Sequence, residues 1–148
     1  MTEPLRTSFE VDRRADQVFR FWTANFAQWW PKSHTVTGDR DVEVVLEPRL
    51  GGRIYERTAA GAIHEWGEIT RWEPPHRLGY RWHLRRDRAD ATDVEITFHD
   101  QDGRTRVEIE HRGWERLGAA GPDWREANTA GWRGLLPHFI EALERSTT

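Results

Sequence analysis

Apolar positions follow two different spacings along the chain, and their order predicts the elements of the fold. Residues 5–11 alternate between apolar and polar side chains, which is typical of a half-buried strand. Residues 15–30 instead carry apolar side chains at helical spacing, with an interruption at 23–25. The interruption predicts two short helices, and Pro31 ends the second because proline cannot continue a helix.

Most of the middle of the chain has the patterns of strands. The predicted strands cover residues 42–46, 53–58, 63–72, 78–84, 94–98 and 106–111. The alternation is clearest from 78 to 84, where every second residue is apolar. A hairpin between the second and third of these strands would place Arg53 opposite Glu68 and Tyr55 opposite Trp66.

The last apolar pattern predicts an amphipathic helix packed on a sheet. Its stripe consists of Trp132, Leu135, Leu136, Phe139, Ile140 and Leu143. The order of elements favours an α+β fold in which one antiparallel sheet wraps around this C-terminal helix. Because 148 residues fit one ordinary core, we expect a single domain over residues 1–148.

Composition adds the suggestion of a binding chamber. The chain has nine tryptophans, one methionine and no cysteine. A buried indole covers a large area but leaves one N–H that needs a partner, so such a set favours a half-polar cavity. The absence of cysteine excludes disulfides, thiolate metal sites and a cysteine nucleophile.

Charge and hydropathy exclude other classes of protein. The formal charge is −3 with acidic and basic residues interspersed, which does not favour nucleic-acid binding. The N-terminal residues lack the pattern of a secretory signal, and no segment approaches the ~20 apolar residues of a membrane span. We therefore expect a cytoplasmic protein without membrane insertion.

Eight short motifs occur in a characteristic order over nearly the whole chain. They are Val-Phe at 18–19, Trp-Trp-Pro at 29–31, Pro-x-x-Gly-Gly at 48–52, Gly-x-Ile at 67–69, Pro-Pro-x-Arg-Leu-x-Tyr-x-Trp at 74–82, Gly-x-Thr-Arg-Val at 103–107, His-Arg-Gly at 111–113 and Gly-Trp at 131–132. This set resembles the standalone bacterial relatives of the C-terminal domain of the activator of the heat-shock-protein-90 ATPase, within the START-like (SRPBCC) helix-grip superfamily.

The resemblance implies a curved antiparallel sheet of about six or seven strands wrapped around a long C-terminal helix, with two short helices after the first strand. It also implies a cavity between sheet and helix. Relatives of this fold include lipid carriers, polyketide binders, aromatase-cyclases and chaperone activators. The eukaryotic activator engages the chaperone through a separate N-terminal domain that these residues do not supply, so a chaperone partner is only an alternative here.

Inward-facing positions of the predicted elements give the candidate ligand-binding residues. They are Trp22, Trp30, Ile54, Glu56, Trp66, Ile69, Trp82, Phe98, Ile109, His111, Trp114, Trp132 and Leu136. The alternative is that most of these side chains simply fill the core. Among them, Trp82, Trp132 and His111 are predicted to lie nearest the ligand.

His111 and Glu56 are the candidate catalytic groups. His111 follows Val107 and Ile109 on one strand face, where a neutral imidazole could donate to a ligand or carry a proton. A carboxylate at Glu56, beside Ile54, would need an arginine or a ligand donor if it faced a cavity. The alternatives are a histidine bonded to a backbone carbonyl or a tryptophan N–H, and a glutamate in an exposed ion pair.

Other chemistries are not supported. The segment His64-Glu65-Trp66-Gly67-Glu68 lacks the second histidine of a zinc motif and has a strand pattern. No Gly-x-Ser-x-Gly elbow occurs, and no lysine follows Gly51-Gly52 as a phosphate loop requires. We expect neither a metal nor a cofactor.

The leading hypothesis is a non-catalytic protein, monomeric or homodimeric, that holds a small hydrophobic or aromatic ligand between the sheet and the C-terminal helix. One alternative is a cyclase-like or hydratase-like enzyme that uses His111 or Glu56 as acid or base. Another is a protein-interaction module with an exposed apolar patch that includes Trp124 and Leu117.

Overall fold

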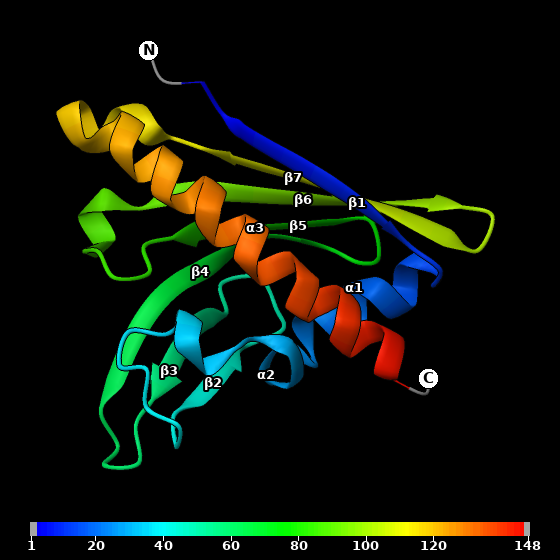
Figure 1. The fold of residues 1–148 in the computed structure, drawn as a ribbon, viewed down its shortest axis with the longest axis horizontal. Coiled ribbons are helices and arrows are strands. Elements are labelled where there is room, and N and C mark those ends of the chain that lie inside the picture. Colours follow the sequence, from blue (N-terminus) through cyan, green and yellow to red (C-terminus); the bar gives the residue numbers. More distant parts are fainter. Residues whose placement is uncertain (1–2, 147–148) are drawn as a thin grey trace.

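In the computed structural model, which describes residues 3–146, a curved antiparallel sheet is crossed by one long helix (Figure 1). The strands are β1 Leu5–Val11, β2 Glu43–Leu46, β3 Arg53–Arg57, β4 Ile63–Glu73, β5 Arg77–Trp82, β6 Thr92–Gln101 and β7 Arg104–Arg112. Their order across the sheet is β1-β7-β6-β5-β4-β3-β2. The helices are α1 Ala15–Thr23, α2 Phe26–Trp29 and α3 Gly121–Arg145. Three 3-10 helices complete the elements: η1 Lys32–His34, η2 Arg88–Asp90 and η3 Trp114–Ala120.

This architecture confirms the predicted helix-grip fold, including the two short helices after β1. The indole N–H of Trp29 in α2 donates to the carbonyl of Trp22 in α1 at 3.3 Å, which ties the two helices together across their bend. Their buried faces, with Val18, Trp22 and Phe26, pack into the core cluster that α3 also joins. Within residues 3–146, no helix is long and apolar enough to span a membrane.

In the central strands, successive side chains point to opposite faces of the sheet, as the alternation in the sequence predicts. Tyr80, Val94 and His111 stand in one row across β5, β6 and β7, since Tyr80 lies opposite Val94 and Val94 lies opposite His111. All three are buried on the concave face that α3 covers. Their strand neighbours, such as Arg81 and Glu110, lie on the convex face.

The predicted register between β3 and β4 is only partly right. Arg53 lies opposite Glu68 as expected, but Tyr55 lies opposite Glu65 and not Trp66. The cause is a bulge between Ile54 and Tyr55, which inserts one extra residue in β4. The bulge leaves the Trp66 side chain fully buried on the concave side.

Helix α3 begins well before the apolar stripe that predicts it. Its first turns carry few buried side chains, so their sequence gives no helical pattern. At its first residue, Gly121, an added Cβ would lie 2.4 Å from the backbone oxygen of Trp114. A glycine is therefore needed where η3 packs against the start of α3.

Candidate functional site

The residues predicted to line a cavity are all buried and pack against one another. None is more than 8% exposed, a value reached by Trp82 and Leu136. Ring centroids of Trp30 and Trp66 lie 5.3 Å apart, and those of Trp22 and Trp132 lie 6.3 Å apart. The interior is thus largely filled by its own aromatic side chains.

A narrow crevice nevertheless opens between α3, η1 and the end of β5. Its volume is about 60 Å³, which is far below the roughly 300–1,000 Å³ of small-molecule pockets. Three predicted residues, Trp30, Trp82 and Trp132, form its walls. The remaining lining residues are His34, Leu84, Asn128, Gly131 and Leu135.

Sequence reasoning did not place those five residues in the site. Leu84 and Leu135 belong to the strand and helix patterns, so their burial could be expected but not their position at the crevice. No sequence pattern marks His34 or Asn128 as a site residue, because η1 and α3 come together only in the folded protein. The backbone oxygen of His34 accepts a hydrogen bond from the Trp30 indole at 3.1 Å, which holds η1 beside the crevice.

His111 is fully buried and both of its ring nitrogens are engaged. The indole N–H of Trp132 donates to Nδ1 at 3.1 Å, and because indole is only a donor, Nδ1 is unprotonated. The proton is therefore on Nε2, which donates to the Thr92 hydroxyl at 2.7 Å. That hydroxyl donates in turn to the carbonyl of Trp82 at 3.3 Å. The chain of bonds joins α3 to β7, β6 and β5.

This environment makes His111 a structural group. Burial lowers the pKa of His111 to about 3, so the ring is neutral near neutral pH. Both nitrogens are already used within the protein, and His111 itself is not among the residues that line the crevice. The geometry does not support His111 as a general acid or base.

Glu56 is also fully buried and saturated. One carboxylate oxygen accepts from the Trp66 indole at 2.7 Å and from the Val36 backbone at 2.6 Å. The other accepts from the backbone N–H and the hydroxyl of Thr37, both at 3.0 Å. Burial alone would raise the pKa of Glu56, but these donors outweigh it and lower that pKa below its usual range. An ionised carboxylate that fastens the loop after η1 is the result, and the exposed ion pair considered above does not occur.

Two other buried polar groups, on Trp22 and Tyr80, are not hydrogen-bonded as fully as His111 and Glu56 are. Within residues 3–146, neither the indole N–H of Trp22 nor the hydroxyl of Tyr80 makes a hydrogen bond of good geometry, although both atoms are buried. Burial raises the pKa of Tyr80, and a weak hydrogen bond from the Trp22 indole to the Tyr80 oxygen offsets part of that rise. Tyr80 is therefore a neutral phenol. The Tyr80 oxygen is a weak acceptor for the Trp22 N–H, and the Tyr80 O–H has no acceptor among residues 3–146.

These donors lie one side chain behind the crevice. The ring of Tyr80 is 5.3 Å from that of Trp82, and the ring of Trp22 stacks on Trp132 at 6.3 Å. Trp82 and Trp132 are crevice walls that retain 8% and 6% exposure. The walls of the crevice thus separate solvent from the Trp22 N–H and the Tyr80 O–H.

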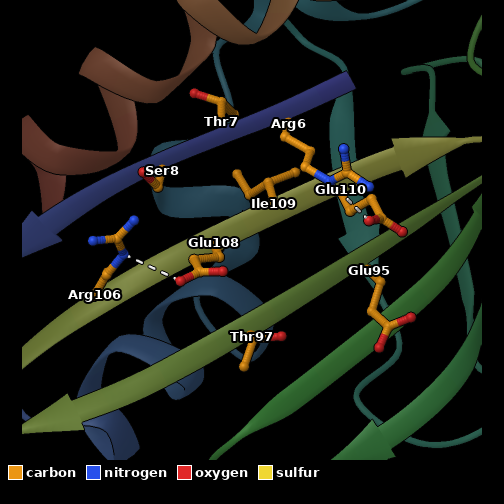
Figure 2. A pocket seen from close by; sticks show the side chains of 9 residues that line it. All are labelled: Arg6, Thr7, Ser8, Glu95, Thr97, Arg106, Glu108, Ile109 and Glu110. Carbon is orange, nitrogen blue, oxygen red and sulfur yellow. Dashed lines mark hydrogen bonds and ion pairs between the residues drawn. The ribbon is translucent and has the colours of Figure 1, made fainter. Parts of the chain in front are cut away.

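A second hollow, of about 380 Å³, lies on the convex face of the sheet (Figure 2). The small side chains of Ser8 and Thr97 leave room there between charged neighbours. Figure 2 shows Arg106 pointing to Glu108, at 3.1 Å, and Arg6 pointing to Glu110, at 3.2 Å. Its third carboxylate, Glu95, is 3.3 Å from Arg112. Each charge in the hollow is therefore compensated by a neighbour.

The remaining candidate sites of the described chain are weak. No cluster of three or more histidine, aspartate or glutamate side chains in residues 3–146 could hold a metal ion. In the region of the apolar patch predicted around Trp124 and Leu117, both side chains are only partly exposed and pack against the core.

Solved structures with the same fold include two that share more than a quarter of their residues with this chain. One is Txn09, an anthrahydroquino-γ-pyrone synthase solved in complex, which is 29% identical with a TM-score of 0.65 over 95% of this chain and 97% of that chain. The other is CalC, a self-sacrificing resistance protein from Micromonospora echinospora, at 26% identity and a TM-score of 0.72 over 95% and 94%.

Protein MLL2253 from Mesorhizobium loti is similar in fold, with 16% identity and a TM-score of 0.72 over 99% of this chain and all of that one. No curated protein matches the sequence significantly. The family described as Activator of Hsp90 ATPase homolog 1-like protein matches residues 12–144, nearly the whole chain. The order of motifs, the helix-grip architecture and this match agree, and the chain belongs to that family.

Proposed function

We propose that the protein binds a planar aromatic compound bearing a carbonyl oxygen, between the sheet and α3. The observation that carries this proposal is the buried Tyr80 O–H, which has no acceptor among residues 3–146 and lies beside the Trp22 N–H, whose contact with the Tyr80 oxygen is weak. An unpaired buried donor costs about 1–3 kcal/mol, so an unpaired donor beside a weakly paired one points to an acceptor from outside the chain. One carbonyl oxygen has two lone pairs and can accept both bonds.

The surroundings of the two donors suit an aromatic ligand. Trp82 and Trp132 stand between them and solvent, and Trp30 completes the aromatic wall at 5.6 Å from Trp82. Offset or edge-to-face contacts with such rings favour a flat, apolar body over a flexible chain. The name of the 29% identical relative, an anthrahydroquino-γ-pyrone synthase, describes a compound of this chemical type, which supports the proposal for this chain.

Binding requires movement at the crevice. A volume of about 60 Å³ does not admit an aromatic compound, so a ligand must displace a wall side chain to reach Tyr80. Trp82 and Trp132 are the candidates, because they cover the donors and keep some exposure. His111 restrains Trp132 through its hydrogen bond, so Trp82 is the wall we expect to move.

Titration with 1,8-dihydroxyanthraquinone, followed by quenching of tryptophan fluorescence, tests the proposal. We expect saturable quenching, and a loss of affinity of about tenfold in Tyr80→Phe because one hydrogen bond to the ligand is removed. The chain has only one other tyrosine, Tyr55, so Tyr55→Phe is the matched control and should bind as the unmodified protein does. Absence of saturable quenching, or equal affinity in Tyr80→Phe, would contradict the proposal.

A second candidate function is catalysis, in which the protein also converts the compound that it binds. The synthase among the relatives favours this function. His111 and Glu56 are saturated, so Tyr80 would be the donor available to polarise a substrate carbonyl. Mass spectrometry of candidate polycyclic ligands after incubation with the protein separates the two functions. A compound recovered unchanged supports binding alone, and a product whose formation stops in Tyr80→Phe supports catalysis.

A further inference from the structure

A separate apolar pocket lies at the other end of β5, beside α1. Its volume is about 330 Å³, within the lower part of the range of small-molecule pockets. It shares no lining residue with the crevice, which lies where β5 ends at Trp82. The pocket is instead lined by residues of α1 and by the prolines of the turn between β4 and β5.

Rings and prolines form most of this pocket. Phe19 and Trp72 meet edge to face with centroids 5.1 Å apart, and Trp72 is only half buried. Pro48, from the turn after β2, and the pair Pro74 and Pro75 complete the apolar lining. Rigid rings on several sides shape a slot that suits a flat aromatic group, because such walls lose little side-chain entropy when a ligand binds.

One polar group of the pocket is free to bind a ligand. Arg20 is exposed at the rim, and no acidic side chain or carbonyl oxygen of residues 3–146 pairs with its guanidinium. Asp16 stands four residues earlier, where it could pair with Arg20, but its carboxylate faces Arg14, with its two oxygens at 3.3 and 3.4 Å. The hydroxyl of Thr23 is also engaged, since it donates to the Phe19 carbonyl at 2.9 Å.

We propose that this pocket is a second binding site, for a small planar aromatic carboxylate. The ring system would lie in the slot against Trp72 and the prolines, and the carboxylate would pair with Arg20. A guanidinium presents two parallel N–H groups that match a carboxylate, which favours this anion over a neutral polar group. The site is independent of the interior site, so either proposal can fail without the other.

The test uses 1-naphthoate as the acid and 1-naphthamide as its uncharged analogue. In ¹H–¹⁵N spectra of the labelled protein, we expect 1-naphthoate to shift the Trp72 indole signal, identified with Trp72→Phe, and to leave that of Trp132 unchanged. Arg20→Gln should weaken binding of 1-naphthoate about tenfold and change that of 1-naphthamide less than twofold. Added salt should weaken the binding of 1-naphthoate to the unmodified protein but not to Arg20→Gln.

Arg133→Gln is the matched control, because Arg133 is another exposed arginine that has no ion pair within residues 3–146 and lies on α3, outside the pocket. It should bind 1-naphthoate as the unmodified protein does. The proposal is overturned if neither compound binds, if Arg20→Gln keeps full affinity for the acid, or if the Trp132 signal shifts in place of Trp72. Since Tyr80→Phe leaves this pocket intact, it should not change the affinity for 1-naphthoate.

Discussion

Tyr80 and His111 occupy the same row of the sheet with only Val94 between them, yet they differ in how fully their polar atoms are hydrogen-bonded. Every polar atom of the His111 ring has a partner, from Trp132 on one side and Thr92 on the other. The Tyr80 O–H has no acceptor among residues 3–146, and its oxygen takes only a weak contact from the Trp22 indole. The saturated group holds α3 to the sheet, whereas the unsaturated group is available to a molecule from outside the chain. Hydrogen-bond satisfaction thus separates a structural group from a candidate binding group.

Removal of the saturated group should have the largest effect on stability. His111→Leu would leave the Trp132 N–H buried without an acceptor and would unlink α3 from Thr92. We expect the free energy of unfolding to fall by about 3 kcal/mol, from one orphaned donor and two lost bonds. Urea unfolding measures it. A loss below about 1 kcal/mol would show that the network contributes little and would remove the contrast with Tyr80.

Lowering the pH should show the contribution of His111 to stability without a mutation. Burial lowers the pKa of His111 to about 3, so between the ordinary pKa near 6.5 and that value the unfolded chain binds a proton that the folded protein does not. Stability then falls as pH falls, by about 1.4 kcal/mol per pH unit, or about 2 kcal/mol between pH 7 and pH 5. Burial, with His138 and Arg85, also lowers the pKa of His34, which acts in the same direction.

Urea unfolding at both pH values, on the unmodified protein and on His111→Leu, isolates the contribution of His111. The variant should lose markedly less stability on acidification, because only His34 and the surface groups remain to titrate. Equal pH dependence in the two proteins would show that His111 takes up its proton as readily in the folded state as in the unfolded one.

The sequence predicts which way Tyr80 and His111 face, but not whether they have partners. Facing follows from alternation along β5 and β7, a local property of the chain. The bonds of His111 depend on Thr92 and Trp132, which lie far from it in sequence and come close only when β6 and α3 pack. For the same reason, no pattern shows that Tyr80 lacks an acceptor.

The hydrogen bond between Glu56 and Trp66 shows a second limit of prediction from the sequence. Straight pairing places Tyr55 opposite Trp66, and only the bulge between Ile54 and Tyr55 changes the register. Because a bulge has no strong sequence signature, the carboxylate that the sequence offered as a catalytic candidate could not be recognised as the acceptor of that indole. The order of elements along the chain and the apolar stripe of α3, in contrast, follow from longer patterns and agree with the structure.

Tyr80→Phe should have the smallest effect on stability and is the most direct test of the contrast. The change removes a hydroxyl that has no acceptor in residues 3–146 and only a weak contact from the Trp22 N–H, so we expect the free energy of unfolding to stay within about 0.5 kcal/mol. Tyr55→Phe is a less neutral control, since that hydroxyl accepts a hydrogen bond from Arg57 at 3.2 Å. Urea unfolding of both variants gives the comparison. A loss above about 1 kcal/mol in Tyr80→Phe would mean that the hydroxyl is already satisfied within the folded protein, and the donor pair would then give no support to a ligand at this site.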